Sequence, residues 1–213
     1  MTEGLRERKK RQTRQYISDV ATALFVERGF DAVTVAEVAE AANVSVNTVY
    51  NYFPAKEDLF LDRAAGLRDR LSRWVRGRGP GESAAGAVLR ELREEVEAVS
   101  PRVGLLPGYG AFMRVVHAAP TLRSRLCALQ EEIRADLEAT LREETGAADG
   151  DPLPELVAGQ LAWIHQTVVG RIGRRMLEGG TPEQVSREAL ELLDDIEELL
   201  GERVLTYAVR GAR

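Results

Sequence analysis

Apolar residues recur along this chain every three or four positions, and short runs of glycine, proline and polar residues separate the segments that show this spacing. Such a period predicts amphipathic helices, so we expect an all-α protein with about nine helices. The first helix covers about 8–28 and ends at Gly29, which suits a left-handed C-cap. Further helices are expected at about 34–42, 45–53, 56–75, 82–99, 109–118, 120–144, 154–178 and from 182 onward.

The most informative stretch is residues 34–56, where two short helices share one apolar seam and are joined by a tight turn. Thr34 and Glu37 have the spacing of a capping box, which fixes the start of the first of these helices. Asn43 stands where the chain must reverse, and asparagine readily adopts the left-handed backbone conformation of such a turn. Ser45 suits the N-cap of the second helix. The pattern predicts a helix-turn-helix.

The second short helix of this motif has an outer face suited to DNA. Val49 and Phe53 point to the core, whereas the other positions carry amide, hydroxyl and aromatic groups instead of the lysine and glutamate of a solvated surface. Such groups reach base edges and phosphates in the major groove. The residues on this face are Val46, Asn47, Thr48, Tyr50, Asn51 and Tyr52.

Residues 33–60 read VTVAEVAEAANVSVNTVYNYFPAKEDLF and resemble the DNA-binding segment of the TetR family of bacterial transcription regulators, in which strings similar to AxxAGVSxGTLYxYFxSKEDL recur. The part TVYNYFPAKEDL makes the resemblance specific. Two positions depart from the family pattern, since Asn43 replaces a glycine and Ala55 replaces a serine that commonly caps the following helix. The second change weakens that helix start by about 1 kcal/mol.

The resemblance also implies roles for individual side chains. Thr48, Tyr50 and Lys56 match positions at which family members commonly contact phosphates, so we expect them to set affinity. Other exposed side chains, such as Asn47 and Asn51, are expected to contact bases, because asparagine bonds adenine at two points. The full set of predicted DNA-binding residues is Thr34, Ser45, Val46, Asn47, Thr48, Tyr50, Asn51, Tyr52 and Lys56.

Charge is unevenly distributed along the chain. The 29 basic and 34 acidic residues give a net charge of −5. Residues 1–14 nevertheless hold six basic and two acidic side chains, a net charge of +4, which leaves −9 for the remainder. A basic arm beside a helix-turn-helix concentrates the attraction for phosphate at one end. We expect a DNA-binding domain at 1–55, with its basic arm at 1–14, and a helical domain at 56–213.

The resemblance implies that this second domain binds a ligand. Segment 101–120 fits that role, because glycines and prolines there stand among large apolar side chains. Their composition predicts a mostly apolar or aromatic small-molecule effector, with His117 or Gln166 giving an orienting bond. The resemblance implies that binding of the effector changes the separation of the DNA-binding domains. The candidate lining residues are Leu67, Trp74, Leu105, Tyr109, Phe112, Met113, His117, Trp163 and Gln166.

The last two long helices, at about 154–178 and from 182 onward, both carry broad apolar stripes. From the sequence alone, these stripes are either internal or meet a second copy in a four-helix bundle. The resemblance favours a homodimer through these helices. Two related DNA-binding domains read a palindromic operator in successive major grooves of double-stranded DNA. We therefore expect a dimeric transcription regulator, most commonly a repressor in this family.

Several other classes of protein lack support in the sequence. The two histidines lie on different predicted helices and Cys127 is the single cysteine, so no metal site or cofactor is expected. No GxSxG, GxxxxGK[ST] or GxGxxG motif is present, which argues against an enzyme. No apolar run approaches the roughly 20 residues that span a bilayer. The single cysteine fits a reducing cytoplasm.

Two alternatives remain open at this level. In the first alternative, the C-terminal domain responds to a protein partner instead of a small molecule. An exposed apolar patch without a cavity is then expected. A helical enzyme that carries an additional DNA-binding domain is the second alternative, and the absence of catalytic motifs disfavours it.

Overall fold

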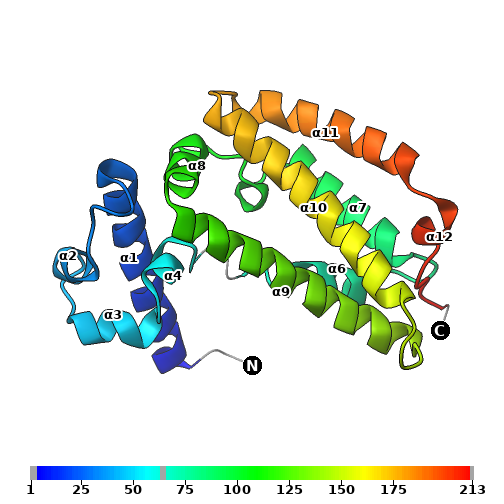
Figure 1. Ribbon diagram of the computed structural model, residues 1–213, viewed down its shortest axis with the longest axis horizontal. Coiled ribbons are helices and arrows are strands. Elements are labelled where there is room, and N and C mark those ends of the chain that lie inside the picture. Colours follow the sequence, from blue (N-terminus) through cyan, green and yellow to red (C-terminus); the bar gives the residue numbers. More distant parts are fainter. Residues whose placement is uncertain (1–3, 63–65, 212–213) are drawn as a thin grey trace. The chain divides into compact units, whose positions relative to one another are not determined.

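The computed structural model describes residues 4–62 and 66–211, and all regular secondary structure within them is helical (Figure 1). Contacts between residues group the chain into two compact units, each described here by itself. The head comprises residues 1–65 and 114–125, and the body comprises residues 66–113 and 126–213. The division into DNA-binding and ligand-binding domains at residue 55 is a statement about function and stays a prediction.

The head is built around a cluster of phenylalanines. The ring of Phe25 lies 4.9 Å from that of Phe30 and 5.7 Å from that of Phe60, between centroids, and all three side chains are buried. Phe30 is therefore a core residue between helices. The helices of the head are α1 (Leu5–Arg28), α2 (Val35–Ala41), α3 (Val46–Tyr52) and α4 (Lys56–Phe60).

The prediction of one helix over about 56–75 is wrong. Helix α4 ends at Phe60, residues 66–69 form a turn, and a separate helix begins at Arg70. The apolar spacing continues through this stretch, but Gly66 lies within it and glycine is a poor helix former. The described residues therefore form more helices than the nine expected from the sequence, and a short helix near the C-terminus adds another.

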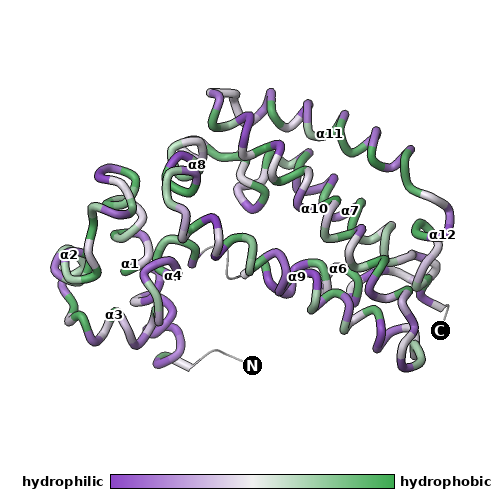
Figure 2. Tube along the Cα trace, in the orientation of Figure 1, coloured by the Kyte–Doolittle hydropathy of each residue, from purple (hydrophilic) through white to green (hydrophobic). Residues whose placement is uncertain are grey.

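The body consists of long helices packed through buried apolar lines. Helices α10 and α11 lie side by side, and α7 packs against both (Figure 1). Figure 2 shows hydrophobic and hydrophilic residues alternating along α10 and α11, as amphipathic helices require. The remaining elements are α6 (Arg70–Gly77), α7 (Ala84–Glu97), η1 (Pro101–Val103), α8 (Tyr109–Ala118), α9 (Pro120–Thr145), α10 (Leu153–Leu177), α11 (Pro182–Leu199) and α12 (Glu202–Leu205).

The sequence left open whether the apolar stripe of the helix at 154–178 is internal or meets a second copy, and the main line of that stripe is internal to the body. Val157, Leu161, Ile164, Val168 and Ile172 of α10 are all buried. Within the described residues, no helix combines the length and the apolarity needed to cross a bilayer.

Close backbone approach fixes α8 on α10. A Cβ atom at Gly110 would lie 2.3 Å from the carbonyl oxygen of Met176, so only glycine fits there without movement of the helices. Gly104 precedes this contact with a φ of +91°, and a Cβ atom there would lie 2.4 Å from the ring of Tyr109. Two of the glycines in segment 101–120 thus serve packing.

A buried arginine ties the C-terminal segment to the body. The Arg78 side chain is 3% exposed, and its Nη1 donates to the carbonyl of Val75 and to Glu144 at 2.8 Å. Its Nε donates to the carbonyl of Ala208 at 3.1 Å. Arg210 in turn donates to the carbonyl of Arg78 at 2.5 Å. This network holds the segment after α12 against the end of α6.

Arg78→Met is expected to lower the free energy of unfolding of the body by about 3 kcal/mol, because it removes several buried hydrogen bonds together with an ion pair. Arg76→Met is the matched control, since Arg76 is 48% exposed and lies 3.6 Å from Glu143, an exposed pair that contributes at most about 1 kcal/mol. Urea unfolding followed by tryptophan fluorescence measures both, because Trp74 and Trp163 lie in the body. Equal effects of the two substitutions would contradict the role of Arg78.

Candidate nucleic-acid interface

The first helix of the helix-turn-helix is fixed at its N-terminus by reciprocal hydrogen bonds. The Thr34 amide donates to Glu37 Oε2 at 2.8 Å, and the Glu37 amide donates to Thr34 Oγ1 at 3.2 Å. The predicted capping box is confirmed. The Thr34 amide, together with the Arg28 guanidinium at 2.5 Å, lowers the pKa of Glu37 to about 2. The carboxylate therefore stays charged at the helix N-terminus across the physiological range.

The turn and the second helix also follow the predicted pattern. Asn43 has a φ of 52°, the left-handed conformation expected where the chain reverses. Ser45 Oγ accepts the Thr48 amide at 3.0 Å and caps α3. Val49 is 0% exposed and Phe53 is 1% exposed, which confirms both as core residues. Helix α3 is thus anchored on one side and free on the other.

The free side of α3 carries the predicted base-reading groups. Val46 and Tyr50 are 42% and 50% exposed, and Asn47 and Asn51 are exposed on the same helix. Exposed apolar and aromatic groups beside two unengaged amides match what a major groove offers, namely methyl groups, base edges and phosphates. The structure therefore brings the centre of the predicted DNA-binding set together on one surface.

Other members of the predicted set are held by local bonds. The Thr34 and Ser45 side chains are exposed but engaged, since Thr34 Oγ1 bonds Glu37 Oε2 and Ser45 Oγ bonds Thr48 Oγ1, each at 2.8 Å. Tyr52 is half-buried at the end of α3. These residues shape the surface, and their contacts with DNA stay predictions.

Lys56 has a structural role that the sequence did not indicate. Its Nζ donates to the carbonyl of Phe30 at 2.6 Å and lies 4.4 Å from the centroid of the Phe30 ring. The lysine thereby ties the start of α4 to the turn after α1. A phosphate contact by Lys56 stays a prediction, and a substitution at this position also affects the packing of the head.

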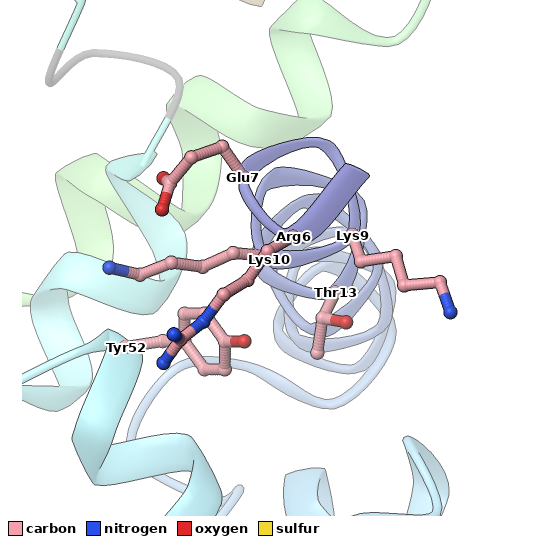
Figure 3. A pocket seen from close by; sticks show the side chains of 6 residues that line it. All are labelled: Arg6, Glu7, Lys9, Lys10, Thr13 and Tyr52. Atoms are coloured by element: carbon pink, nitrogen blue, oxygen red, sulfur yellow. The ribbon is translucent and has the colours of Figure 1, made fainter. Parts of the chain in front are cut away.

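The basic arm is largely helical and meets the recognition helix. Helix α1 begins at Leu5, and a hollow of about 400 Å³ lies between its first turns and Tyr52. Figure 3 shows Arg6 and Lys10 extending toward the side of α1 where Tyr52 lies, whereas Lys9 points away from it. The lining residues are Arg6, Glu7, Lys9, Lys10, Thr13 and Tyr52.

Sequence reasoning identified the charge of this arm but missed its partner. Arg6, Lys10 and Thr13 follow helical spacing, so the signal for one helical face was present. Their proximity to Tyr52 depends on packing between segments distant in sequence. Residues 1–3 of the predicted arm lie outside the described residues. The hollow joins basic and aromatic groups, a combination that suits a phosphate of the DNA backbone.

The predicted ligand-lining residues do not share one environment. Leu105 is buried, and His117, Trp163 and Gln166 are exposed. Gln166 donates to Gln130 at 2.8 Å. His117 groups with the head, whereas the other candidates belong to the body. The remaining candidates, all half-buried, are Leu67, Trp74, Tyr109, Phe112 and Met113. A ligand role for any of these residues stays a prediction.

A capped helix-turn-helix with a polar recognition helix and an adjacent basic face defines the chain as a DNA-binding protein. Comparison with known proteins agrees with this class. Residues 17–62 match the family model described as bacterial regulatory proteins, tetR family. Over these residues the chain is similar to the TetR family of bacterial regulatory proteins, which agrees with a DNA-binding role for the head.

Relatives and solved structures extend the likeness beyond the head. The regulator TcmR of Streptomyces glaucescens is 29% identical over 174 residues, which cover 78% of this chain and 75% of TcmR. The repressor KstR of Rhodococcus jostii (strain RHA1) is 37% identical over 71 residues, 33% of this chain and 32% of KstR. Both are transcription regulators and not enzymes, as the sequence predicts.

The fold is shared with solved structures of low sequence identity. NalD of Pseudomonas aeruginosa superposes with a TM-score of 0.56 at 18% identity, covering 87% of this chain and 96% of NalD. The SmeT–triclosan complex superposes with a TM-score of 0.55 at 16% identity, covering 91% and 94%. These two comparisons establish the architecture.

Lys10→Ala is expected to weaken binding to all duplexes and to reduce the slope of log affinity against log salt by about 1, because one phosphate contact is lost. Arg8→Ala is the matched control, since Arg8 is an exposed basic residue of the same helix that does not line the hollow, whereas Lys10 extends toward Tyr52 (Figure 3). Fluorescence anisotropy at several salt concentrations gives both slopes. If Arg8→Ala changes the slope as much as Lys10→Ala, the hollow has no special role.

Asn51→Ala is expected to reduce discrimination between a selected duplex and random DNA by about 1–3 kcal/mol, the contribution of a bidentate base contact. Tyr50→Phe removes a hydroxyl expected to bond a phosphate, so affinity for both duplexes should fall together, by about 1 kcal/mol. Competition binding with the two duplexes separates these outcomes. A Tyr50→Phe variant that changes discrimination, or an Asn51→Ala variant that does not, would reverse the assignment.

Proposed function

We propose that this protein is a homodimeric repressor that binds a palindromic operator and is released by a mostly apolar or aromatic small molecule. The observation that carries the proposal is the exposed face of α3, where Val46, Asn47, Tyr50 and Asn51 stand above the buried Val49. A rigid backbone and free side chains are what direct readout of a base sequence needs.

Repression is supported by the relatives. KstR is named as a transcriptional repressor, and the NalD structure is described as the secondary repressor of a multidrug efflux pump. A protein that occupies DNA near a promoter blocks transcription without any further chemistry. Chromosomal DNA lies in the bacterial cytoplasm, so the proposal places the protein there.

Dimer formation is supported by apolar side chains left exposed on the last long helices. Leu156 and Trp163 of α10 are 60% and 54% exposed, and their spacing of seven places them on one face. Leu199 of α11 is 82% exposed. Burial of each such side chain against a second copy contributes about 2 kcal/mol. Because Trp163 lies on this face, the proposal assigns it to the dimer interface in preference to ligand contact.

Release by a small molecule is supported by one structural neighbour. SmeT was solved as a complex with triclosan. The body of the present chain has the same architecture and supplies half-buried aromatic residues, among them Trp74, Tyr109 and Phe112. Two of these rings, Tyr109 and Phe112, stack with centroids 5.7 Å apart. An aromatic effector suits such surroundings.

Selection of bound duplexes from a random pool at physiological salt tests the function. Enrichment of two inverted half-sites about 10 base pairs apart, or a multiple of that spacing, is expected for a two-fold symmetric dimer. Enrichment of a single, non-repeated site would remove the palindrome and the symmetric dimer from the proposal. Retention of no duplex by the folded protein would remove the DNA-binding role assigned to α3.

Trp163→Glu is expected to shift the protein from dimer to monomer, with at least a hundredfold rise in the dimer dissociation constant, because an interface aromatic is replaced by a charge. Val209→Glu is the matched control, since Val209 is also an exposed apolar residue of the body, at 50%, but lies in the C-terminal segment. Sedimentation velocity at several concentrations measures both. A dimer that survives Trp163→Glu would place the interface elsewhere.

A further inference from the structure

A polar cluster lies inside the body among α6, α7 and α10. Arg70 is 6% exposed and His165 is 7% exposed. The Arg70 guanidinium carbon lies 5.5 Å from the centroid of the Trp74 ring, and the rings of Trp74 and His165 meet edge to face at 6.1 Å. Glu95 completes the cluster, with its Oε2 at 3.4 Å from Arg70 Nη1.

This cluster contains unsatisfied polar atoms. Among the described residues, the buried side-chain nitrogen or oxygen atoms without a hydrogen-bond partner are Arg70 Nη1, Glu95 Oε2 and His165 Nε2. Arg70 has one good bond here, from Nη2 to the carbonyl of Arg102 at 3.1 Å. Buried polar groups in proteins are almost always hydrogen-bonded. Arg70 Nη1 and Glu95 Oε2 face each other as an ion pair at 3.4 Å without a hydrogen bond, and His165 Nε2 has no hydrogen bond either, so the chain leaves the hydrogen-bonding capacity of this cluster unfilled.

The charges of the cluster restrict the chemistry of any group that fills it. Arg70 and Glu95 offset each other inside the cluster. Arg102 lies 3.9 Å from the other carboxylate oxygen of Glu95, but its side chain is 77% exposed, so solvent screens its charge. Burial lowers the pKa of His165 to about 4, with a smaller contribution from Arg70, so its imidazole is neutral at pH 7. A carboxylate entering the cluster would be repelled by Glu95, and an ammonium group would be repelled by Arg70. A neutral group that both accepts and donates a hydrogen bond suits Arg70 and Glu95 together.

We propose that this cluster binds a hydroxyl group of a neutral aromatic effector. The hydroxyl oxygen accepts from Arg70 Nη1, its hydrogen is donated to Glu95 Oε2, and the attached ring lies against Trp74. A second oxygen on the same molecule bonds His165 Nε2. The inference deepens the proposed function, on which it rests, by naming the class of effector and the residues that recognise it.

The arrangement also distinguishes this cluster from ordinary buried ion pairs. At 3.4 Å, Arg70 and Glu95 are close but do not form a hydrogen bond between Nη1 and Oε2. A hydroxyl placed between these atoms gives each a charge-assisted bond that the free protein lacks. The Arg70 guanidinium carbon lies 5.5 Å from the centroid of the Trp74 ring, so a molecule bonded to Arg70 comes close to that ring.

Calorimetric titration of the full-length protein with 2-naphthol, 2-methylnaphthalene and 2-naphthoate tests the inference. These probes share the naphthalene ring system and differ only in the substituent at position 2, which is a hydroxyl, a methyl or a carboxylate group. We expect 2-naphthol to bind at least tenfold more tightly than each of the others. Equal affinities, or a preference for 2-naphthoate, would overturn the inference without any mutation.

Glu95→Gln provides a gain-of-binding test, because it keeps the shape of the side chain but leaves Arg70 without an opposing charge. The affinity for 2-naphthoate is expected to rise at least tenfold and the preference for 2-naphthol to fall. Glu97→Gln is the matched control, an exposed residue of the same helix that should leave all affinities unchanged. Unchanged binding of 2-naphthoate by a folded Glu95→Gln protein would contradict the assignment.

Anisotropy of a selected duplex, measured in parallel, separates this inference from the proposed function. A hydroxyl preference without release of DNA would support the cluster and contradict induction by this class of molecule. Intact DNA binding without any hydroxyl preference would leave the regulator in place and overturn the cluster.

Discussion

The position of the recognition helix depends on one arginine. Helix α3 has seven residues, far below the length at which an isolated helix is stable, so tertiary contacts must hold it. Arg14 of α1 donates to the carbonyl of Tyr52 at 2.8 Å and to Asp62 at 2.8 Å, and its guanidinium lies 4.5 Å from the Phe53 ring centroid. The C-terminus of α3 is thereby fixed to α1, and the exposed amides of Asn47 and Asn51 can be presented in a defined direction.

Two arginines of the body, Arg78 and Arg70, are buried to a similar degree but differ in how completely their guanidinium groups are hydrogen-bonded. Arg78 is 3% exposed and its guanidinium bonds two backbone carbonyls and Glu144. Arg70 is similarly buried, yet its Nη1 has no hydrogen bond, and neither have the facing atoms of Glu95 and His165. Burial of an arginine is costly unless its donors are paired. The fold explains the hydrogen bonds of Arg78, whereas the unsatisfied Nη1 of Arg70 is the observation behind the proposed effector site.

The sequence predicted features that depend on neighbouring residues and missed those that depend on distant ones. The capping box at Thr34 and the left-handed Asn43 are decided within a few residues, so local chemistry was sufficient. The bond from Lys56 to Phe30 joins residues 26 apart, and the burial of His165 depends on Trp74 in another helix. The apolar period alone also concealed the break between α4 and α6, because spacing reports which residues face a core and not whether the backbone is continuous.

The cluster in the body and the DNA-binding surface are connected through the chain itself, since Arg70 is the first residue of α6 and the first segment of the head ends at residue 65. A ligand shifts such a system only by the difference between its affinities for two states. A hundredfold loss of operator occupancy requires about 2.7 kcal/mol of that difference. Hydrogen bonds to charged groups contribute about 1.5–3 kcal/mol each, so two bonds, one to Arg70 and one to Glu95, are sufficient if they are made in only one of the two states. An equally apolar molecule without a hydroxyl cannot make these two hydrogen bonds. It therefore lacks the difference in affinity between the two states, however well it fits the surrounding aromatic side chains.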